Sequence, residues 1–137
     1  MSLILLALIL NLSSSSPTFN TYPNYRVYTG ESSGTAVKVS TDNRYVMVGF
    51  NSGNARIYYT SGSLYAYCNG HNSSIIAIEE IPYNGWITLD SSGKAIRWST
   101  YGSQQYVWTF NSSVTDLSVA GYNGYYWVAF NLGNSVV

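Results

Sequence analysis

Few side chains in this sequence of 137 residues are suited to nucleophilic or metal chemistry. It contains one histidine, His71, and one cysteine, Cys68, three residues apart. A catalytic cysteine needs a base that a third group orients, and no acidic residue follows His71 in such a pattern. A single cysteine excludes an intrachain disulfide, and the pair offers too few soft ligands for a metal such as zinc. Both residues are therefore predicted to be structural.

The acidic residues also lack the arrangement of an acid–base pair. Glu79 and Glu80 are neighbours at the end of an apolar run, and adjacent strand residues point to opposite faces of a sheet. Asp42, Asp90 and Asp116 lie at turns or strand ends, where aspartates bond nearby backbone N–H groups. No glycine-rich phosphate loop or serine elbow occurs. The chain is therefore predicted not to be an enzyme and to need no cofactor.

Composition narrows the class of protein. Six basic and six acidic residues give a net charge of zero, whereas a nucleic-acid binder needs a clustered basic surface. The 14 tyrosines and four tryptophans fit half-buried, pleated surfaces. No long stretch repeats apolar residues with the 3.6-residue period of an amphipathic helix. We therefore expect an all-β protein that does not bind nucleic acid.

The N-terminal segment differs from the rest of the chain. An apolar run at Leu3–Leu12 is followed by four serines, Ser13–Ser16, which offer places for signal-peptidase cleavage. The run is too short to span a bilayer as a helix, which takes about 20 residues. We expect a signal peptide at 1–16, a linker at 17–23 and a secreted protein with no membrane span. The alternatives are a hydrophobic first strand or a wrongly chosen start codon, and the alternative localisation is cytoplasmic.

Sequons agree with secretion. Asn72 and Asn111 each begin an Asn-x-Ser/Thr triplet and are candidate glycosylation sites, and Asn11 begins another inside the predicted signal peptide. Such triplets arise easily in a chain rich in Asn and Ser. The expected localisation therefore depends mainly on the N-terminal segment.

The sequence repeats itself at an offset of 40 residues. NSGNARIYYT at 51–60 returns as SSGKAIRWST at 91–100 and begins again as NLGNSVV at 131–137. The register holds from about residue 20 to the last residue without an insertion. Periods of about 20–50 residues are typical of solenoids, propellers and arrays.

Each copy contains four short apolar or alternating segments joined by Gly, Asn and Ser turns. In the first copy, strands are predicted over 35–39, 45–50, 55–59 and 64–68. Four strands in about 40 residues are what one propeller blade needs. We therefore predict a partial β-propeller of about three four-stranded antiparallel blades, the last incomplete, over residues 24–137, with blades near 35–68, 75–110 and 114–137.

The middle copy resembles a WD-repeat blade. NGHNSSIIAI at 69–78 carries the Gly-His pair of that family, and GKAIRW at 93–98 carries its turn Gly and terminal Trp. Trp98 is followed by Ser99 rather than Asp, and Tyr58-Tyr59 stands in place of the dipeptide in the first copy. Quinoprotein-like repeats, whose strand ends in Gly…Trp, are the alternative, because residues 102–108 fit that pattern.

This resemblance implies a buried hydrogen-bonded network and a function. In WD-repeat blades a His, a strand Ser or Thr, a turn Asp and the Trp bond to one another, and the matching residues here are His71, Thr88, Asp90 and Trp98. The resemblance implies a non-catalytic scaffold that binds a protein partner. A secreted carbohydrate-binding propeller and a fragment of a quinoprotein-like enzyme are the alternatives.

Four tyrosines lie in predicted loops and are candidate partner contacts: Tyr22, Tyr83, Tyr101 and Tyr122. Tyrosine covers a large contact area with few rotatable bonds, so these rings suit a protein partner or a sugar. A propeller closes with about 4–8 blades. We therefore expect the remaining blades to come from a longer chain or from other copies, because the open edge of a last blade invites pairing.

Overall fold

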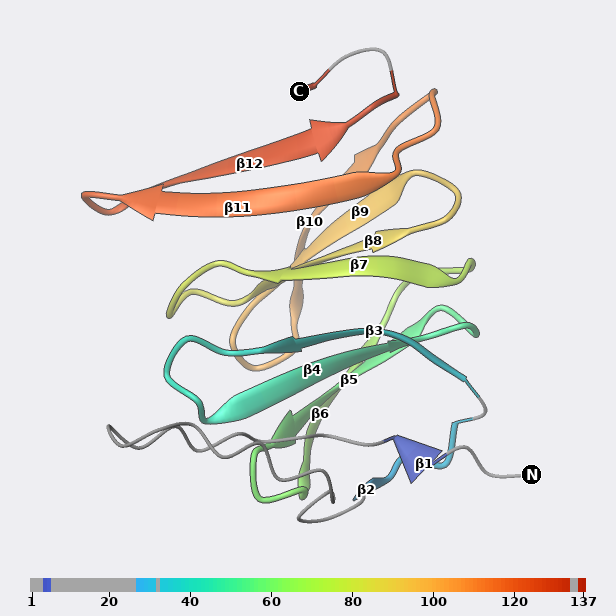
Figure 1. Ribbon diagram of the computed structural model, residues 1–137, viewed down its shortest axis with the longest axis vertical. Coiled ribbons are helices and arrows are strands. Elements are labelled where there is room, and N and C mark those ends of the chain that lie inside the picture. Colours follow the sequence, from blue (N-terminus) through green and yellow to red (C-terminus); the bar gives the residue numbers. More distant parts are fainter. Residues whose placement is uncertain (1–3, 6–26, 32, 134–135) are drawn as a thin grey trace, which may run out of the picture.

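The computed structural model describes residues 4–5, 27–31, 33–133 and 136–137 (Figure 1). Apart from Ile4 and Leu5, the predicted signal peptide at 1–16 lies outside these residues, as do the linker at 17–23 and Tyr22. The described residues form strands and turns and no helix. No helix in this part of the chain is therefore available to cross a membrane.

The described strands form four antiparallel sheets. Two of them have four strands, in the orders β3-β4-β5-β6 and β7-β8-β9-β10, and two have two strands, β1-β2 and β11-β12. The strands are β1 (Ile4–Leu5), β2 (Val27–Tyr28), β3 (Gly34–Val39), β4 (Tyr45–Phe50), β5 (Asn54–Tyr59), β6 (Leu64–Asn69), β7 (Ile75–Glu80), β8 (Trp86–Asp90), β9 (Lys94–Trp98), β10 (Gln104–Thr109), β11 (Asp116–Tyr122) and β12 (Tyr125–Asn131). We call β3–β6 the first blade, β7–β10 the second blade and β11–β12 the half-blade.

The first blade, the second blade and the half-blade stack in chain order, and each begins with a strand at the same edge of the stack. Figure 1 shows β3, β7 and β11 side by side, and β7 contacts both of the others. β6 is the outer strand of the first blade. β2 lies 40 residues before Tyr67–Cys68 of β6, so β2 has the sequence position of the outer strand of a preceding blade. The all-β, partial-propeller fold predicted from the sequence is therefore confirmed.

Turn residues explain why the sequence repeats. Gly53, Gly93 and Gly133 have φ of 89°, 87° and 77°, a region where a side chain is strained, and the first two lie in the β4–β5 and β8–β9 turns. A Cβ on Gly53 would also lie 2.7 Å from the carbonyl oxygen of His71, so only glycine fits this turn. The recurring Ser-Gly phrases at 52–53 and 92–93 are therefore the hairpin turns between the second and third strands of the first two blades.

The half-blade departs from the first two blades at its hairpin. Tyr122, expected in a loop, is instead the last residue of β11. Asn123 and Gly124 have φ of 49° and 78°, so they form a two-residue turn of the kind that Asn-Gly favours. This tight turn extends the strand pairing as far as Tyr122 and Tyr125.

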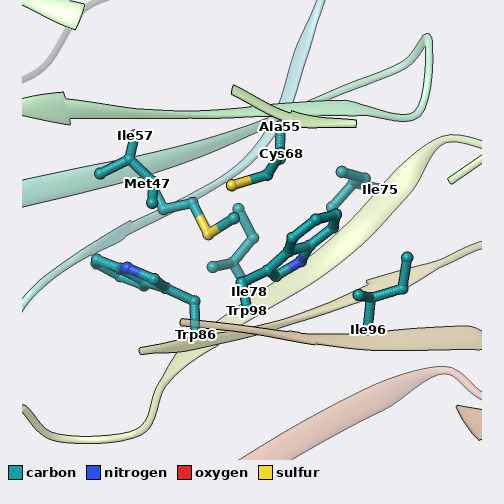
Figure 2. Packing of buried hydrophobic residues seen from close by; sticks show 9 residues of the cluster. All are labelled: Met47, Ala55, Ile57, Cys68, Ile75, Ile78, Trp86, Ile96 and Trp98. Carbon is teal, nitrogen blue, oxygen red and sulfur yellow. The ribbon is translucent and has the colours of Figure 1, made fainter. Parts of the chain in front are cut away.

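Apolar side chains fill the space between the first two blades (Figure 2). The first blade contributes Met47, Ala55, Ile57 and Cys68, and the second contributes Ile75, Ile78, Trp86, Ile96 and Trp98. The sheets approach so closely that a Cβ on Gly49 would lie 2.5 Å from Cγ2 of Ile75. A second cluster, which includes Leu89, Leu117 and Phe130, joins the second blade to the half-blade.

Candidate functional site

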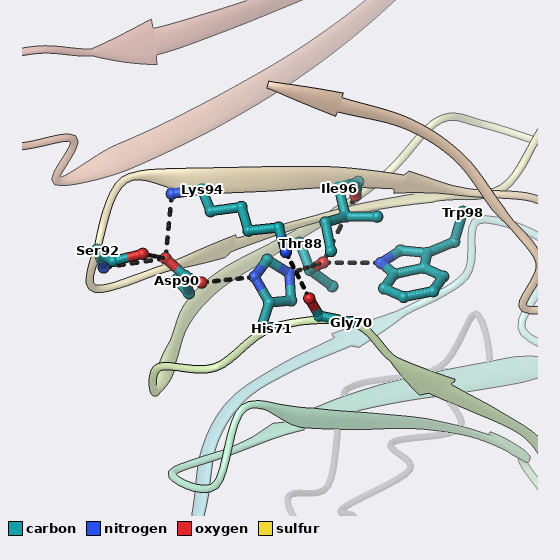
Figure 3. Close-up of polar contacts among 8 residues, drawn as sticks. All are labelled: Gly70, His71, Thr88, Asp90, Ser92, Lys94, Ile96 and Trp98. Atoms are coloured by element: carbon teal, nitrogen blue, oxygen red, sulfur yellow. Dashed lines mark hydrogen bonds and ion pairs between the residues drawn. The ribbon is translucent and has the colours of Figure 1, made fainter. Parts of the chain in front are cut away.

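The four residues of the predicted network lie together in the second blade (Figure 3). His71 follows β6, Thr88 and Asp90 belong to β8, and Trp98 ends β9. Trp98 Nε1 donates to Thr88 Oγ1 at 2.7 Å, and Thr88 Oγ1 lies 2.6 Å from His71 Nε2. His71 Nδ1 lies 2.8 Å from Asp90 Oδ2. All four side chains are buried, so the network is closed to solvent.

The donors and acceptors of this network fit a neutral imidazole. Burial lowers the pKa of His71, against the raising effect of Asp90. A neutral ring that donates from Nδ1 to the Asp90 carboxylate must accept at Nε2. The Thr88 hydroxyl then donates to Nε2 while it accepts the Trp98 N–H. Both ring nitrogens of His71 and the Trp98 N–H therefore have a matched partner, and neither ring nitrogen is free to act as a base.

Asp90 also organises the turn after β8. Its Oδ1 accepts hydrogen bonds from the Ser92 backbone, the Ser92 hydroxyl and the Lys94 backbone, at 2.9, 2.6 and 3.0 Å. Burial opposes ionisation, but these bonds and His71 together lower the pKa of Asp90. Lys94 Nζ reaches the carbonyl of Gly70 at 2.6 Å. The network thus ties the β6–β7 loop to the β8–β9 turn, which is a structural task.

The other residues considered for chemistry are either buried or bound to another group of the protein. Burial raises the pKa of the Cys68 thiol to about 12, so the reactive thiolate is scarce at neutral pH. Glu79 pairs with Lys38 at 2.7 Å, whereas Glu80 accepts from the backbone and hydroxyl of Thr41. In the part of the chain that the structure describes, no three His, Cys, Asp or Glu side chains gather where they could hold a metal ion.

A pocket opens between the first two blades, at the end of the sheets that carries the β3–β4 and β7–β8 turns. Its volume is about 280 Å³. Tyr45 and Tyr65 of the first blade form one wall, and Trp86, Tyr83 and Tyr101 of the second blade form the other. We call it the tyrosine pocket. Its lining also includes Asp42, Arg44 and Glu80.

The first-blade wall is a packed aromatic cluster. The Tyr65 ring lies 5.0 Å from the rings of Tyr45 and Tyr59, centroid to centroid, and those two are 5.5 Å apart. The Arg44 guanidinium lies over the Tyr45 ring, 5.4 Å from its centroid. Burial, and then Tyr45, raises the pKa of Tyr65, so its hydroxyl stays protonated at neutral pH. The three rings therefore pack against one another and form a continuous aromatic surface.

The second-blade wall carries two exposed rings. Tyr83 is 72% exposed and Tyr101 75% exposed, and they stand on the neighbouring β7–β8 and β9–β10 turns. Tyr83 has a φ of 59°, in the left-handed region, where the equivalent residues are Asn43 and Asn123. Asparagine tolerates this region better than tyrosine does. The Tyr83 ring therefore gains little burial at a position that disfavours it.

The remaining candidate residues lie elsewhere. Tyr122 is 75% exposed on the half-blade hairpin and does not line the tyrosine pocket. Asn72 and Asn111 are exposed in the β6–β7 and β10–β11 loops, at the opposite end of the sheets. The structure therefore brings Tyr83 and Tyr101 together. Sequence reasoning missed the wall formed by Tyr45 and Tyr65, because only the stacking of the blades places it there.

Comparisons with known proteins agree on the fold. The β-propeller domain of Myceliophteria thermophila Cps50 (Swd1) matches with a TM-score of 0.64 and 16% identity, over 74% of this chain and 32% of that chain. The computationally designed Ika8 protein matches with a TM-score of 0.62 and 21% identity, over 74% and 30%. No protein-family model matches the sequence. No curated protein matches it significantly.

The chain spans only 32% and 30% of the lengths of these two solved chains. Identities of 16% and 21% bear on the fold alone. At that level, the β-propeller fold predicted from the sequence is confirmed. The described strands form a partial β-propeller, with a tyrosine-lined pocket between its first two blades.

Proposed function

We propose that this chain is part of a non-catalytic β-propeller that binds a segment of another protein in the tyrosine pocket. The observation that carries the proposal is the pair of exposed rings, Tyr83 and Tyr101, over a cavity of about 280 Å³ between two blades. Rigid aromatic rings at a concave seam are typical of the anchor points of protein interfaces. The cavity has room for one or two side chains rather than for a large cofactor.

The state of the reactive groups supports binding over catalysis. Both nitrogens of His71 are engaged in the interior, and the Cys68 thiol is buried and protonated. Glu79 and Glu80 bind different partners on the first blade. The two matched chains give no support to the alternative function, a fragment of a quinoprotein-like enzyme.

Selection from a random peptide library on the immobilised full chain tests this function. We expect peptides whose affinity falls about fivefold or more in Tyr83→Ala and Tyr101→Ala, since anchor residues contribute over about 1 kcal/mol. Tyr122→Ala is the matched control, because that ring is equally exposed but lies outside the pocket. Selection of no pocket-dependent peptide, with neutral oligosaccharides binding instead, would favour the carbohydrate-binding alternative and contradict the proposal.

We propose further that additional strands cover the half-blade, supplied by a longer chain or by other copies. Tyr125 and Trp127 are 74% and 73% exposed, whereas Met47, which is equivalent to Trp127, is fully buried. Large exposed aromatic patches mark interaction surfaces. Sedimentation of the chain at increasing concentration should show self-association that Trp127→Lys reduces. A monomer at all concentrations, with Trp127 equally exposed to a fluorescence quencher, would count against other copies as the cover.

We propose secretion on the basis of the N-terminal sequence and the two exposed sequon residues, Asn72 and Asn111. Expression in a eukaryotic secretory host should give a mature N-terminus after residue 16 and a mass shift that glycosidase removes. Retention of Met1 in the cell, with no glycan, would contradict this localisation.

A further inference from the structure

We infer that the tyrosine pocket recognises a positively charged side chain, arginine or lysine, of the bound segment. This inference rests on the function proposed above and names the chemistry of its ligand. Three observations support it. Asp42 and Glu80 line the pocket, the Arg44 guanidinium lies over the Tyr45 ring, and the rings of Tyr83 and Tyr101 are exposed.

Two carboxylates flank the pocket, one from each blade, and both are held in place. Asp42 Oδ1 accepts from the Ser40 hydroxyl at 2.6 Å and from the Arg44 backbone at 3.0 Å. Glu80 Oε2 accepts from the Thr41 backbone and hydroxyl, at 2.6 and 2.5 Å. Among the described residues, the second oxygen of each carboxylate accepts no hydrogen bond from a side chain or turn. Each can therefore accept from a ligand without losing its present bonds.

After the Ser40 hydrogen bond, the charge of Arg44, the cation of the pocket, helps to lower the pKa of Asp42, but Arg44 forms no ion pair with either carboxylate in the described part of the chain. The Arg44 guanidinium lies over the Tyr45 ring. The Ser40 hydrogen bond is the largest influence that lowers the pKa of Asp42, so this carboxyl stays ionised at neutral pH. With Asp42, Glu80 and Arg44 as its charged residues, the pocket has an excess of negative charge.

The exposed rings favour the same kind of ligand. A guanidinium or ammonium group over the face of a tyrosine is attracted by the ring quadrupole. Tyr83 and Tyr101 present such rings beside the two carboxylates. An acidic segment would be repelled by Asp42 and Glu80, and a neutral sugar would gain from the rings alone. The arrangement therefore favours a basic side chain over both.

A charge-only change in the ligand gives the sharpest test. From the peptides selected on the full chain, one with arginine at the position whose binding depends on Tyr83 and Tyr101 is resynthesised with citrulline, the neutral isostere of arginine, at that position. We expect the citrulline peptide to bind about threefold to tenfold more weakly at low salt, since a charged hydrogen bond at a partly exposed site contributes about 0.7–1.4 kcal/mol. The difference should shrink as salt is added.

Protein variants localise the effect. Asp42→Asn and, independently, Glu80→Gln should weaken the basic peptide and leave the citrulline peptide unchanged. Asp116→Asn is the matched control, because it removes the same charge from an exposed aspartate outside the pocket. An amide spectrum of each variant shows that it remains folded.

The outcomes separate this inference from the proposed function. Equal affinity for the arginine and citrulline peptides, with dependence on Tyr83 and Tyr101 retained, overturns the inference and leaves the proposed function standing. An equal loss in Asp42→Asn and Asp116→Asn also overturns it, because the effect is then one of overall charge. Selected peptides without basic residues count against it, and the absence of any pocket-dependent peptide removes both.

Discussion

The first and second blades have the same strand pairing but carry different side chains at the positions of the polar network. In the first blade, the four network positions of the second blade are occupied by Glu31, Val48, Phe50 and Tyr58. Strand pairing is nonetheless the same, since Val48 faces Arg56 as Thr88 faces Ile96. A buried polar network is therefore one way to complete a blade of this protein, and it is not required.

The first blade replaces the network with an ion pair. Arg56 Nη2 lies 2.7 Å from Glu31 Oε1, and its Nη1 donates to the carbonyl of Thr29. The guanidinium also lies over the rings of Phe50 and Tyr67, 5.7 and 5.1 Å from their centroids. The loop before the blade is thus tied to its third strand by charge, where the second blade uses His71.

This difference between the blades affects the hydrogen bonding of Tyr58, which occupies in the first blade the position that Trp98 has in the second. Trp98 donates to Thr88, but Val48 offers no acceptor at the matching place, and within the described residues the buried Tyr58 hydroxyl has no hydrogen-bond partner. Burial raises the pKa of Tyr58. The shared features are the turn glycines and apolar strands, and these sustain the repeat when the polar residues change.

Exchanging one residue between the blades should have the largest effect. Thr88→Val leaves both the Trp98 N–H and His71 Nε2 without a partner, so we expect a loss of about 2–4 kcal/mol in the free energy of unfolding. Urea denaturation measures it. The reverse change, Val48→Thr, should alter stability by less than about 1 kcal/mol, because the new hydroxyl has Tyr58 as a candidate partner. Thr88→Ser keeps the hydroxyl and is the control; a loss as large as that of valine would contradict the account.

The next largest effect is expected where the first two blades pack against each other. Gly49 is equivalent to Leu89, yet its Cβ would lie 2.5 Å from Ile75 Cγ2. We expect Gly49→Ala to destabilise the chain by about 1–3 kcal/mol through overpacking. Combining it with Ile75→Ala, which removes the clashing methyl, should lose less than the sum of the two single changes. Strict additivity, measured by urea denaturation, would show that the blades do not approach as closely as described.

Much of the fold could be predicted because its signals are local. Turn glycines at 53 and 93 need a positive φ, and apolar segments between them alternate as strands do. The four network residues could be named because a family pattern gave their positions. Asp90 is the last residue of β8, and this place puts its carboxylate beside the His71 ring.

The tyrosine pocket could be anticipated only in part. Tyr83 and Tyr101 were identifiable as loop residues, but nothing local indicated that Asp42 and Glu80 would flank them. These carboxylates come from different blades, and only the stacking of the blades brings them to one pocket. The ion pair of Arg56 and Glu31 was missed for the same reason, because its members are 25 residues apart.

A pH titration sharpens the comparison, because the first blade has no counterpart of His71 at the matching position. The folded-state pKa of His71 lies below 6.5, so the unfolded chain takes up this proton first as pH falls. Stability should therefore be level above pH 6.5 and decline below it, by at most about 1.4 kcal/mol per pH unit. His71→Gln should remove this decline down to about pH 5, where carboxylates begin to titrate. An equal slope in wild type and variant, by urea midpoints, would assign the decline to other groups.

The smallest effect expected concerns the left-handed residue of the β7–β8 turn. Tyr83→Asn installs the residue that the first blade has at position 43. We expect a gain of about 0.5 kcal/mol in the free energy of unfolding, because asparagine tolerates a φ near 60° better, together with a loss of peptide binding. The reverse change, Asn43→Tyr, should cost a similar amount. A variant that is both more stable and a poorer binder would show that Tyr83 serves recognition rather than folding. If Tyr83→Asn instead destabilises the chain, the Tyr83 ring contributes to packing and this account is wrong.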